Sequence, residues 1–358
     1  MNNDTAILIT GATGYIGRHV CAALTRDLQP VIAMLRDPDQ QLPALRHAVT
    51  SLGGQGSLVQ AVHGDLDQPE LGLSDPLPPL KAIIHLGARF AWQLPMDMAR
   101  RTNVDGAMAV ARLAQQQRTR LVFISGFMLE NHGHLSRLGI HLMHADQTDW
   151  QQVYRRAGGY EASKLEAAIR VREYAREHAL DMVEVQPATV AGDSRSGQLD
   201  SQQPLYQLID NLAQGRMAAI PGTRQHWLPL VAVDLLAALI ARAAISPVVP
   251  PRVLALDSRT PSLQGMLGLA ASVLEQRAPR RFLPMPVLAA LLRIPGLPRL
   301  LNTWPEALHF IQTTRFDTAC SDRFLASQGL AHPPIDDAIA ASACFYRQQQ
   351  MASQQQPA

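Results

Sequence analysis

The stretch Thr10-Gly11-Ala12-Thr13-Gly14-Tyr15-Ile16-Gly17 decides the fold of this chain. It follows the apolar run Ala6–Thr10 and opens a helix-like stretch near residues 15–27. Glycines repeated at every third position permit a tight turn, a close approach of backbone to a pyrophosphate, and close helix–strand packing. The phosphates would then lie at the positive end of the helix dipole. The turn therefore predicts a dinucleotide site, and the alternative is a glycine-rich turn without a ligand.

Around this turn, short apolar runs alternate with helix-like stretches through the first half of the chain. The expected strands are Ala6–Thr10, Val31–Leu35, Leu58–His63, Ala82–Leu86, Leu121–Ser125 and Met182–Gln186. The expected helices lie near 15–27, 40–53, 97–117 and 160–178. Buried strands that alternate with helices indicate a parallel sheet covered on both faces. We therefore expect an α/β fold with a Rossmann-type, doubly wound parallel sheet over residues 1–187.

The pattern changes near residue 188, where prolines and glycines become frequent. Helical patches near 204–214, 232–245 and 262–276 alternate there with short strands. We interpret residues 188–346 as mainly a smaller substrate-binding lid, with some segments returning to the Rossmann core. The Gln-rich residues 347–358 are expected to form a flexible tail.

Composition excludes several classes of protein. The chain has 358 residues, of which 47% are hydrophobic and 17% charged, and its formal net charge is +2, so a large core is feasible and nothing favours nucleic acid. Its three cysteines, Cys21, Cys320 and Cys344, have no metal-ligand spacing. The N-terminus lacks signal-peptide features, and no uncharged apolar stretch reaches membrane-spanning length. We expect a cytoplasmic protein without a metal site.

The end of the second strand decides the choice of cofactor. NAD sites place an acidic residue there to bind the ribose hydroxyls. Here Leu35 is followed by Arg36, which suits a 2′-phosphate, while Asp37 precedes Pro38 and is interpreted as a turn residue. The sequence favours NADP(H) over NAD(H), and the alternative is that Arg36 is a solvated surface residue.

Further motifs resemble the extended short-chain dehydrogenase/reductase family over nearly the whole chain. Gly64-Asp65-Leu66 resembles the family's segment after the third strand. His85-Leu86-Gly87-Ala88 resembles its segment beneath the nicotinamide ribose, and Asn103-Val104-Asp105-Gly106 resembles one of its helix starts. Tyr160-Glu161-Ala162-Ser163-Lys164 matches the Tyr-x-x-x-Lys signature, and Pro187 the proline after the sixth strand. The resemblance implies cofactor contacts from Gly11, Thr13, Gly14, Tyr15, Ile16, Gly17, Arg36, Asp65, Leu66, Leu86, Gly87, Ala88, Asn103, Tyr160, Lys164, Pro187 and Val190.

Narrower motifs resemble the thioester-reductase and fatty-acyl-CoA-reductase-like branch of this family. They are the run from Pro187 to Gly197, the run Leu228–Asp234, and Phe316-Asp317-Thr318 with Gly329-Leu330 and Pro333-Pro334-Ile335. The resemblance implies a reductase that acts on a carbonyl or thioester of an acyl-type or apolar substrate.

Tyr160 and Lys164 are the expected acid/base pair. Residues four apart lie on one face of a helix. A nearby ammonium favours the phenolate, so we expect a lowered tyrosine pKa. Tyr160 would exchange a proton with the substrate oxygen, and Lys164 would also hold the nicotinamide ribose. The alternative is a chance pair on an amphipathic helix.

One position departs from the family pattern. The family has Ser or Thr as the second residue of a pair after the fifth strand, but the run here is Phe123-Ile124-Ser125-Gly126-Phe127. Ser125 is the candidate donor to the substrate oxygen, with the backbone N–H of Gly126 or Phe127 as alternatives. If none of them serves, the chain is a catalytically weak NADP-binding regulator.

Two other regions leave alternatives open. Residues 127–158 carry four histidines without metal-site spacing, so we expect a substrate-side loop. Residues 282–301 are apolar and flanked by arginines; they would form proline-broken core, a wall of an acyl cleft, or a patch in contact with a membrane surface. An epimerase, dehydratase or hydroxysteroid-type dehydrogenase is the other candidate activity. By analogy, helices near 97–117 and 160–178 would pair in a homodimer.

Overall fold

The computed structural model describes residues 5–355, with side chains to residue 353. These residues form two compact units. The first contains the chain up to Pro187 together with Leu236–Ala255 and Cys320–Leu330, and the second contains Ala188–Leu235, Leu256–Ala319 and the chain after Ala331. Each unit is therefore built from separated segments of sequence.

The first unit is built on a seven-stranded sheet in the order β10-β6-β5-β4-β1-β2-β3, and all of its strand pairs are parallel. The strands are β1 (Ala6–Thr10), β2 (Val31–Leu35), β3 (Val59–His63), β4 (Leu80–His85), β5 (Arg120–Ile124), β6 (Met182–Pro187) and β10 (Arg252–Ala255). This is the doubly wound parallel sheet that the sequence predicts. The carboxyl ends of all these strands meet at one edge, where such folds bind ligands.

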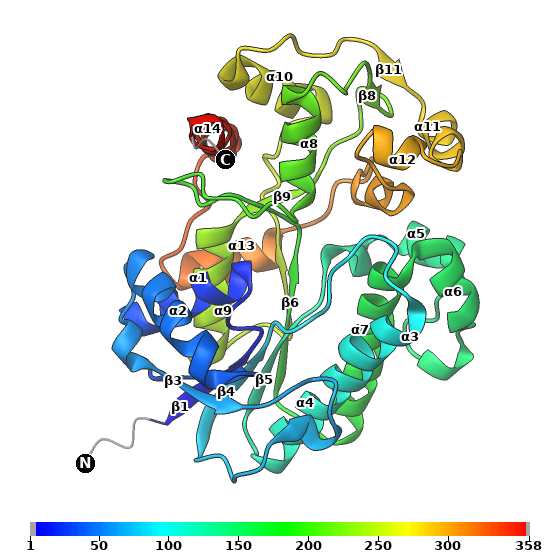
Figure 1. Cartoon of the computed structure of the whole chain (residues 1–358). Helices are drawn as coiled ribbons and strands as arrows, with labels where there is room; N and C mark the ends of the chain where they lie inside the picture. Colours follow the sequence, from blue (N-terminus) through cyan, green and yellow to red (C-terminus); the bar gives the residue numbers. More distant parts are fainter. Residues whose placement is uncertain (1–4, 356–358) are drawn as a thin grey trace. The chain divides into compact units, whose positions relative to one another are not determined.

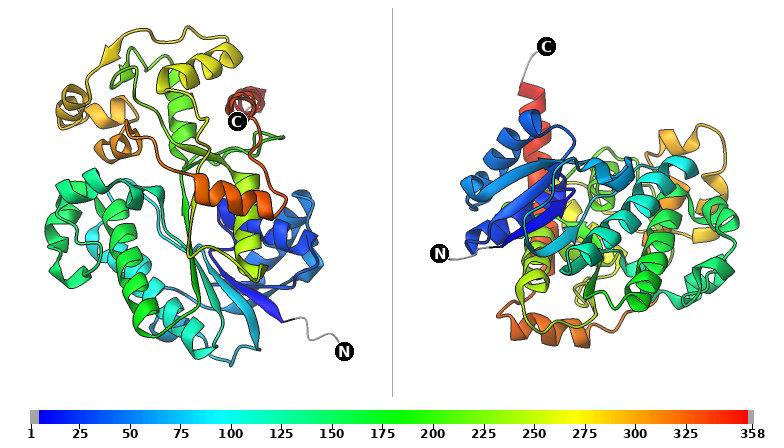
Figure 2. Two further views of the ribbon diagram at one scale, coloured as in Figure 1. Left: turned by 180° about the vertical axis from the view of Figure 1, so that it is seen from behind. Right: turned by 90° about the horizontal axis from the view of Figure 1, so that it is seen from below.

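Helices cover both faces of this sheet. They are α1 (Tyr15–Arg26), α2 (Pro38–Ser51), α3 (Met96–Ala99), α4 (Gly106–Gln116), α7 (Gly159–Glu177), most of α9 (Val233–Ile245) and α13 (Ala319–Ser327). Figures 1 and 2 show α4 and α7 on one face and α1, α2 and α9 on the other. An ion pair of 3.1 Å between Arg242 of α9 and Asp27 at the end of α1 agrees with that placement.

The predicted strands agree with the observed ones to within two residues, but β10 was missed. It lies in the proline-rich second half, directly after Pro250-Pro251, and pairs with β6 at the edge of the sheet. The stretch near 97–117 also differs from one regular helix. A π-helical turn over Arg100–Asp105 separates α3 from α4, and such turns mark local insertions that often serve function.

The segment 127–158 is not the long loop that we expected. It contains α5 (His132–Leu138) and α6 (Trp150–Ala157), with 3₁₀ turns at Phe127–Glu130 and Ala145–Gln147. Asn131 caps α5 and Asp149 caps α6, each by accepting a hydrogen bond from a backbone N–H. Both helices are short, and each cap satisfies a backbone N–H group of the first turn that has no partner within the helix.

The second unit has two short parallel sheets and its own core. β7 (Thr189–Ala191) pairs with β9 (Leu230–Ala232), and β8 (Ile220–Pro221) pairs with β11 (Phe282–Leu283). Its helices are α8 (Pro204–Ala213), α10 (Leu263–Leu274), α11 (Met285–Leu291), α12 (Leu297–Leu300) and α14 (Ile335–Gln355), with a 3₁₀ turn at Pro305–Phe310. The main core joins α8, α10 and α14.

The described part of the expected tail is helical rather than frayed. Residues 347–355 continue α14, where Arg347 donates to the Val273 carbonyl and to Glu275. The remainder of the predicted tail, 356–358, lies outside the described residues. Within residues 5–355, no helix combines the length and apolarity needed to cross a bilayer.

Candidate active site

The glycine turn between β1 and α1 is closed so tightly that only glycine fits it. Gly11 has a φ of +73°, and a Cβ there would lie 2.7 Å from the backbone nitrogen of Gly87. At Gly17 a Cβ would lie within 2.1 Å of the Gly11 carbonyl oxygen. The turn itself is held by a hydrogen bond of 3.1 Å from Gly14 N–H to the Gly11 carbonyl. Glycine at these positions therefore lets the backbone close into a tight turn where a phosphate group would approach.

The amino end of α1 fits an anion. Thr13 and Gly14 are exposed, Gly14 caps the helix without a side chain, and the first turn contains no acidic residue. Nothing in this turn offsets the positive helix end, so its N–H groups suit a pyrophosphate. Of the next two residues, Tyr15 is 8% exposed and Ile16 is half-buried. These residues fit a dinucleotide, as the sequence predicts.

The end of β2 carries the cofactor-selecting position. Arg36 is exposed there, at the carboxyl edge of the sheet. Asp37 caps α2 and accepts from the backbone N–H of Gln40 at 3.1 Å, so its carboxylate is engaged in the turn as interpreted from the sequence. Arg36, a cation, therefore follows Leu35 directly, at the position where NAD sites place an acidic residue.

The segments after β3 and β4 lie against each other. The side chain of Leu66 fills the space beside Gly87, where a Cβ would lie 2.6 Å from it. Asp65 accepts from the backbone N–H of Asp67 at 3.1 Å. Leu86 is half-buried and Ala88 is exposed. The structure thus places these five predicted cofactor residues together at the sheet edge, while their contacts with a cofactor stay predictions.

Asn103 ties this edge to α7. Its Oδ1 accepts from the Arg89 backbone N–H at 2.7 Å, and its Nδ2 donates to the Arg89 carbonyl at 3.1 Å and to Ser163 Oγ at 2.9 Å. Ser163 in turn donates to the carbonyl of Tyr160. Asn103 is 3% exposed, so its role in this structure is to fix the loop after β4 against the helix that carries Tyr160.

Tyr160 and Lys164 lie on the first turns of α7, at the carboxyl end of β5. Lys164 Nζ donates to the Ile124 carbonyl at 2.6 Å and lies 5.8 Å from the centre of the Phe123 ring. The ring of Tyr160 meets Phe90 edge-to-face, with centroids 4.6 Å apart. Helix and strand together therefore fix both side chains at the same edge as the glycine turn.

Burial sets the protonation of this pair, and for the phenol it reverses our expectation. Desolvation raises the pKa of Tyr160 to about 12, whereas we expected the ammonium to lower it. Desolvation also lowers the pKa of Lys164 to about 8, against a smaller opposing effect of the Glu184 carboxylate. At neutral pH the phenol is neutral and the amine still charged. The phenol is thus in the form that donates a proton.

Ser125 is engaged by a buried ion pair. Its hydroxyl donates to Glu184 Oε1 at 2.5 Å, and Arg172 of α7 donates to both oxygens of Glu184, at 2.6 and 3.0 Å. The Glu184 side chain is 0% exposed and that of Arg172 is 20% exposed. In this arrangement the Ser125 hydroxyl proton points at the carboxylate. Its predicted role as donor to substrate stays a prediction, and the hydroxyl would have to leave Glu184 to perform it.

Gly126, where the family pattern has Ser or Thr, is sterically open. A Cβ built there meets nothing within 4 Å, and the backbone is extended, with φ −177° and ψ 154°. Any residue adopts such a conformation. The glycine is therefore not required by the fold, and the space beside it is free for a larger side chain.

A buried histidine joins the ends of β1 and β4. His85 Nδ1 lies 2.7 Å from Thr10 Oγ1, which also accepts from the Gly87 N–H. Burial, with a smaller contribution from the Lys164 charge, lowers the pKa of His85 to about 3. This histidine is therefore neutral and fixes the strand ends on which the glycine turn rests.

The predicted site residues near the end of β6 fall in different units. Pro187 is the last residue of β6 in the first unit, whereas Val190 lies in β7 of the second. The structure brings the other predicted residues to one edge of the first unit. The place of Val190 in a cofactor site stays a prediction.

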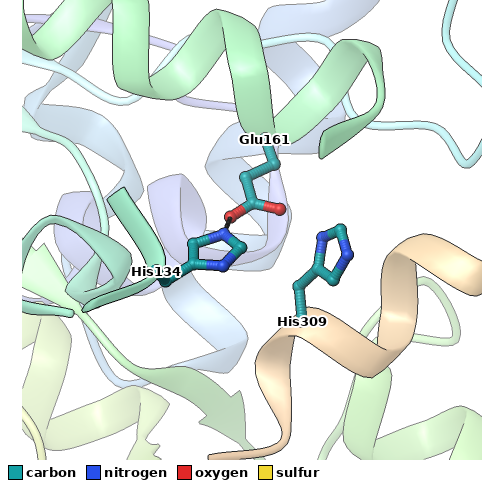
Figure 3. A group of neighbouring side chains, drawn as sticks. All are labelled: His134, Glu161 and His309. Carbon is teal, nitrogen blue, oxygen red and sulfur yellow. Dashed lines mark hydrogen bonds and ion pairs between the residues drawn. The ribbon is translucent and has the colours of Figure 1, made fainter. Parts of the chain in front are cut away.

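Several residues of the histidine-rich segment contact α7, and one of them is a histidine. His134 Nε2 lies 2.7 Å from Glu161 Oε1, so α5 is tied to the start of α7 beside Tyr160 (Figure 3). His309, the third side chain in that view, belongs to the second unit. The contact positions the helix that carries Tyr160.

Sequence reasoning missed the residues that support the pair. Glu184 and Arg172 were not singled out, nor was the contact between Thr10 and His85. A signal existed for the first, because Glu184 is a lone acidic residue within the apolar strand Met182–Pro187. A charge in such a strand requires a partner, but the sequence does not show which of the arginines supplies it.

Comparison with known proteins gives one family and several related reductases. The family model described as male sterility protein, an NAD-binding family, matches residues 9–240. A polyketide synthase–nonribosomal peptide synthetase, ACE1, of Pyricularia oryzae is 27% identical over 67% of this chain, and the L-2-aminoadipate reductase large subunit of Penicillium chrysogenum is 26% identical over 69%. The aligned parts are only 6% and 19% of those proteins.

A solved structure supports the fold over nearly the full length. The terminal R domain from the myxalamid PKS-NRPS biosynthetic pathway superposes with a TM-score of 0.75, covering 97% of this chain and 91% of that one, at 20% sequence identity. At that identity the likeness establishes the fold and leaves the substrate open.

Proposed function

The chain belongs to the male sterility protein family, a thioester-reductase-like branch of the extended short-chain dehydrogenases/reductases, and is an NAD(P)-dependent oxidoreductase; from that premise we propose that it reduces acyl thioesters or the corresponding carbonyl compounds with NADPH. The observation that carries the proposal is that the neutral Tyr160 phenol and the charged Lys164 amine both lie on the first turns of α7, at the edge of the sheet that holds the glycine turn. A phenol and an ammonium at a dinucleotide edge suit delivery of a proton to a carbonyl oxygen.

In the proposed reaction the cofactor supplies a hydride to the carbonyl carbon. Tyr160 donates its phenolic proton to the carbonyl oxygen, which becomes the negative centre as the hydride arrives. The ammonium of Lys164, held by the Ile124 carbonyl, stabilises the phenolate that remains. Asn103 and Ser163 hold the backbone of Tyr160, and the Phe90 ring packs edge-to-face against its phenol ring, which restricts the position of the donor.

The preference for NADPH rests on Arg36. An exposed guanidinium directly after β2 suits the two charges of a 2′-phosphate, and the nearby Asp37 is occupied as a helix cap. The preference for acyl substrates rests on the relatives, because those named as reductases include one acting on L-2-aminoadipate and one terminal domain of a synthetase. Both preferences are parts of the proposal.

The first test compares Tyr160→Phe with Tyr174→Phe, a change on the same helix away from the sheet edge. We expect the wild type to oxidise NADPH in the presence of acyl thioesters or aldehydes, and Tyr160→Phe to lower kcat by about 10²–10⁴-fold, as loss of a positioned acid does. NADPH binding, measured by fluorescence titration, should be retained in both variants. If the wild type and Tyr160→Phe show the same background oxidation of NADPH with every substrate while both bind NADPH, the reductase proposal is wrong and a cofactor-binding protein remains.

The second test concerns the cofactor. Arg36→Ala should weaken NADPH binding by about tenfold or more while leaving NADH binding nearly unchanged, since one charge-assisted hydrogen bond contributes about 1.5–3 kcal/mol. Arg112→Ala removes an exposed arginine of α4 and is the matched control. If both variants bind NADPH as the wild type does, Arg36 does not read the phosphate.

A further inference from the structure

The second unit contains an apolar cavity of about 360 Å³. It lies between α8 and the segment 282–303, which we call the leucine flap; the flap runs from β11 through α11 and α12 to Thr303. Ligand sites for small molecules have volumes of about 300–1,000 Å³. The cavity is therefore large enough for a ligand and lies wholly within one unit.

Two separate hydrophobic clusters face this cavity. The main core of the unit contributes Leu228, with Leu208 packed against it. The flap forms a second, small core around Leu288 together with Leu308 of the following 3₁₀ turn, with Leu301 at its margin. A domain usually has one main core, with smaller satellite clusters under its long segments. Here the two remain apart, and the space between them is lined by both.

The flap is tied down at its two ends. At one end the β8–β11 ladder holds it, with hydrogen bonds of 2.8 Å from Ile220 N–H to the Arg281 carbonyl and from Gly222 N–H to the Leu283 carbonyl. At the other end Asn302 Nδ2 donates to Asp210 at 3.1 Å, and Asn211 Nδ2 donates to the Asn302 carbonyl at 3.2 Å. The cavity walls are thus anchored on α8 and β8.

Between these anchors the flap is built from weak elements. α11 has seven residues and α12 has four, and both contain proline. Gly296 and Asn302 have positive φ angles of 85° and 43°. Ile294 and Leu300 are 51% and 71% exposed. Short helices with exposed apolar residues open at low cost, so the flap can admit a ligand without unfolding the main core.

The chemistry of the cavity is aliphatic with one polar end. Among its described lining residues, leucine predominates and none is aromatic. The polar lining residues are Gln207, Asn211, Arg216, Asn302 and Thr303. Asp210 binds both Arg216 and Asn302, and Asn211 binds Asn302 and Thr303, so these groups gather at one place. A flexible chain with one polar end fits this arrangement better than a flat ring.

We propose that this cavity binds the aliphatic tail of the acyl substrate, with the polar end of the cavity toward the functional group of that chain. The proposal rests on the proposed reductase function for the identity of the substrate. Binding of the tail rests on the cavity alone. The class of ligand is therefore a saturated or weakly branched acyl chain, and short polar acyl groups are excluded as good ligands.

The first experiment measures binding without cofactor. Butanoyl, octanoyl and dodecanoyl thioesters of N-acetylcysteamine are titrated into the full chain by calorimetry. Each methylene buried should strengthen binding by about fourfold, so octanoyl should bind about a hundredfold or more tighter than butanoyl. Absence of saturable binding by the two longer chains would overturn the proposal.

The second experiment uses two adjacent leucines. Leu301 lines the cavity, whereas Leu300 is 71% exposed and is absent from the lining. Leu301→Trp should fill part of the cavity and weaken octanoyl binding by about tenfold or more, while Leu300→Trp should stay within about twofold of wild type. Equal binding by the two variants would overturn the proposal. Circular dichroism, together with unchanged NADPH affinity, verifies that both variants are folded. If Leu301→Trp does not fold, Ala219→Phe replaces it and fills the cavity from the side of β8.

The outcome separates this proposal from the proposed function. Chain-length-dependent binding without NADPH oxidation would support the cavity and contradict the reductase. NADPH oxidation at equal rates with butanoyl and octanoyl thioesters, and without tight binding of either, would support the reductase and overturn the cavity proposal.

Discussion

The end of β5 and β6 in the first unit and the leucine flap in the second differ in how they hold their shape. At the strand ends, Ser125, Arg172 and the fully buried Glu184 form a compact polar cluster with short hydrogen bonds. In the flap, short helices enclose a cavity between two unjoined apolar clusters. Directional hydrogen bonds hold the first region, whereas apolar contacts and hydrogen bonds at its two ends hold the second.

The difference matches what each region has to do in the proposed reaction. Proton delivery requires a donor whose position is fixed to within a fraction of an ångström. Binding an aliphatic chain requires only apolar area and room, because the hydrophobic effect has no direction. We therefore expect the strand-end cluster to tolerate substitution poorly and the flap to tolerate it well.

The largest expected effect tests that contrast with two isosteric changes. Glu184→Gln leaves the Arg172 charge facing a neutral amide and should lower the free energy of unfolding by about 3 kcal/mol, the lower end for a broken buried pair, because Arg172 is 20% exposed. Asp210→Asn in the second unit should cost about 1 kcal/mol, since its partner Arg216 is 38% exposed and the pair is partly solvated. Urea unfolding with separate probes for each unit measures both.

A loss by Asp210→Asn as large as that of Glu184→Gln would contradict the contrast. The Glu184→Gln variant should also shift the pH dependence of turnover, because the carboxylate favours the charged form of Lys164. Its removal should lower the pKa of Lys164 below about 8. As pH rises, the variant should therefore lose the Lys164 charge, and with it activity, at a lower pH than the wild type does. A merely structural Glu184 would leave the pH profile unchanged.

The next effect concerns acid. Burial holds the folded pKa of His85 at about 3, below its ordinary value of 6.5, so its contribution to stability is present above pH 6.5 and is lost as pH falls toward 3. Between pH 6.5 and pH 4.5 this histidine should account for a loss of about 2–3 kcal/mol, at about 1.4 kcal/mol per pH unit. His85→Asn should remove that component of the acid sensitivity.

The matched control is His178→Asn, at the exposed end of α7. Unfolding free energies of the three proteins are compared at both pH values. If His85→Asn loses as much stability on acidification as wild type and the control do, the buried histidine does not carry the effect. The flap, which lacks a histidine in residues 282–303, should show no such dependence.

The smallest effect is a gain at Gly126. The extended backbone and the open space there admit Gly126→Thr without strain, and the new hydroxyl would stand where the resembled family has its donor. We expect kcat with an acyl thioester to rise by about tenfold, less than the ~10²–10³ that removal of an optimised donor costs. Gly126→Val has the same shape without the hydroxyl and should give no gain.

Equal rates for Gly126→Thr and Gly126→Val would mean that a hydroxyl at this position adds nothing to catalysis. A gain in both would assign the effect to packing around Phe127 rather than to hydrogen bonding. Either result would leave Ser125 or a backbone N–H as the remaining candidate donor.

Local patterns were enough to predict six of the seven strands of the first unit and its glycine turn. Strand and helix periodicity, the spacing of Gly11, Gly14 and Gly17, and the pair Tyr160 and Lys164 all act over a few residues, and the structure places them as expected at one edge of the sheet. By contrast, β10 and the helices of segment 127–158 were missed because short elements among prolines or polar residues have weak periodicity.

The sequence by itself determined the doubly wound sheet and its glycine turn and predicted Tyr160 and Lys164 as the acid/base pair, because each of these features depends on neighbouring residues. Only the tertiary structure decided that burial keeps the Tyr160 phenol neutral, that Ser125 faces Glu184, and that a cavity separates α8 from the flap. Desolvation, long-range ion pairs and empty volume arise when distant segments come together. No local pattern encodes them, and so they had to be observed.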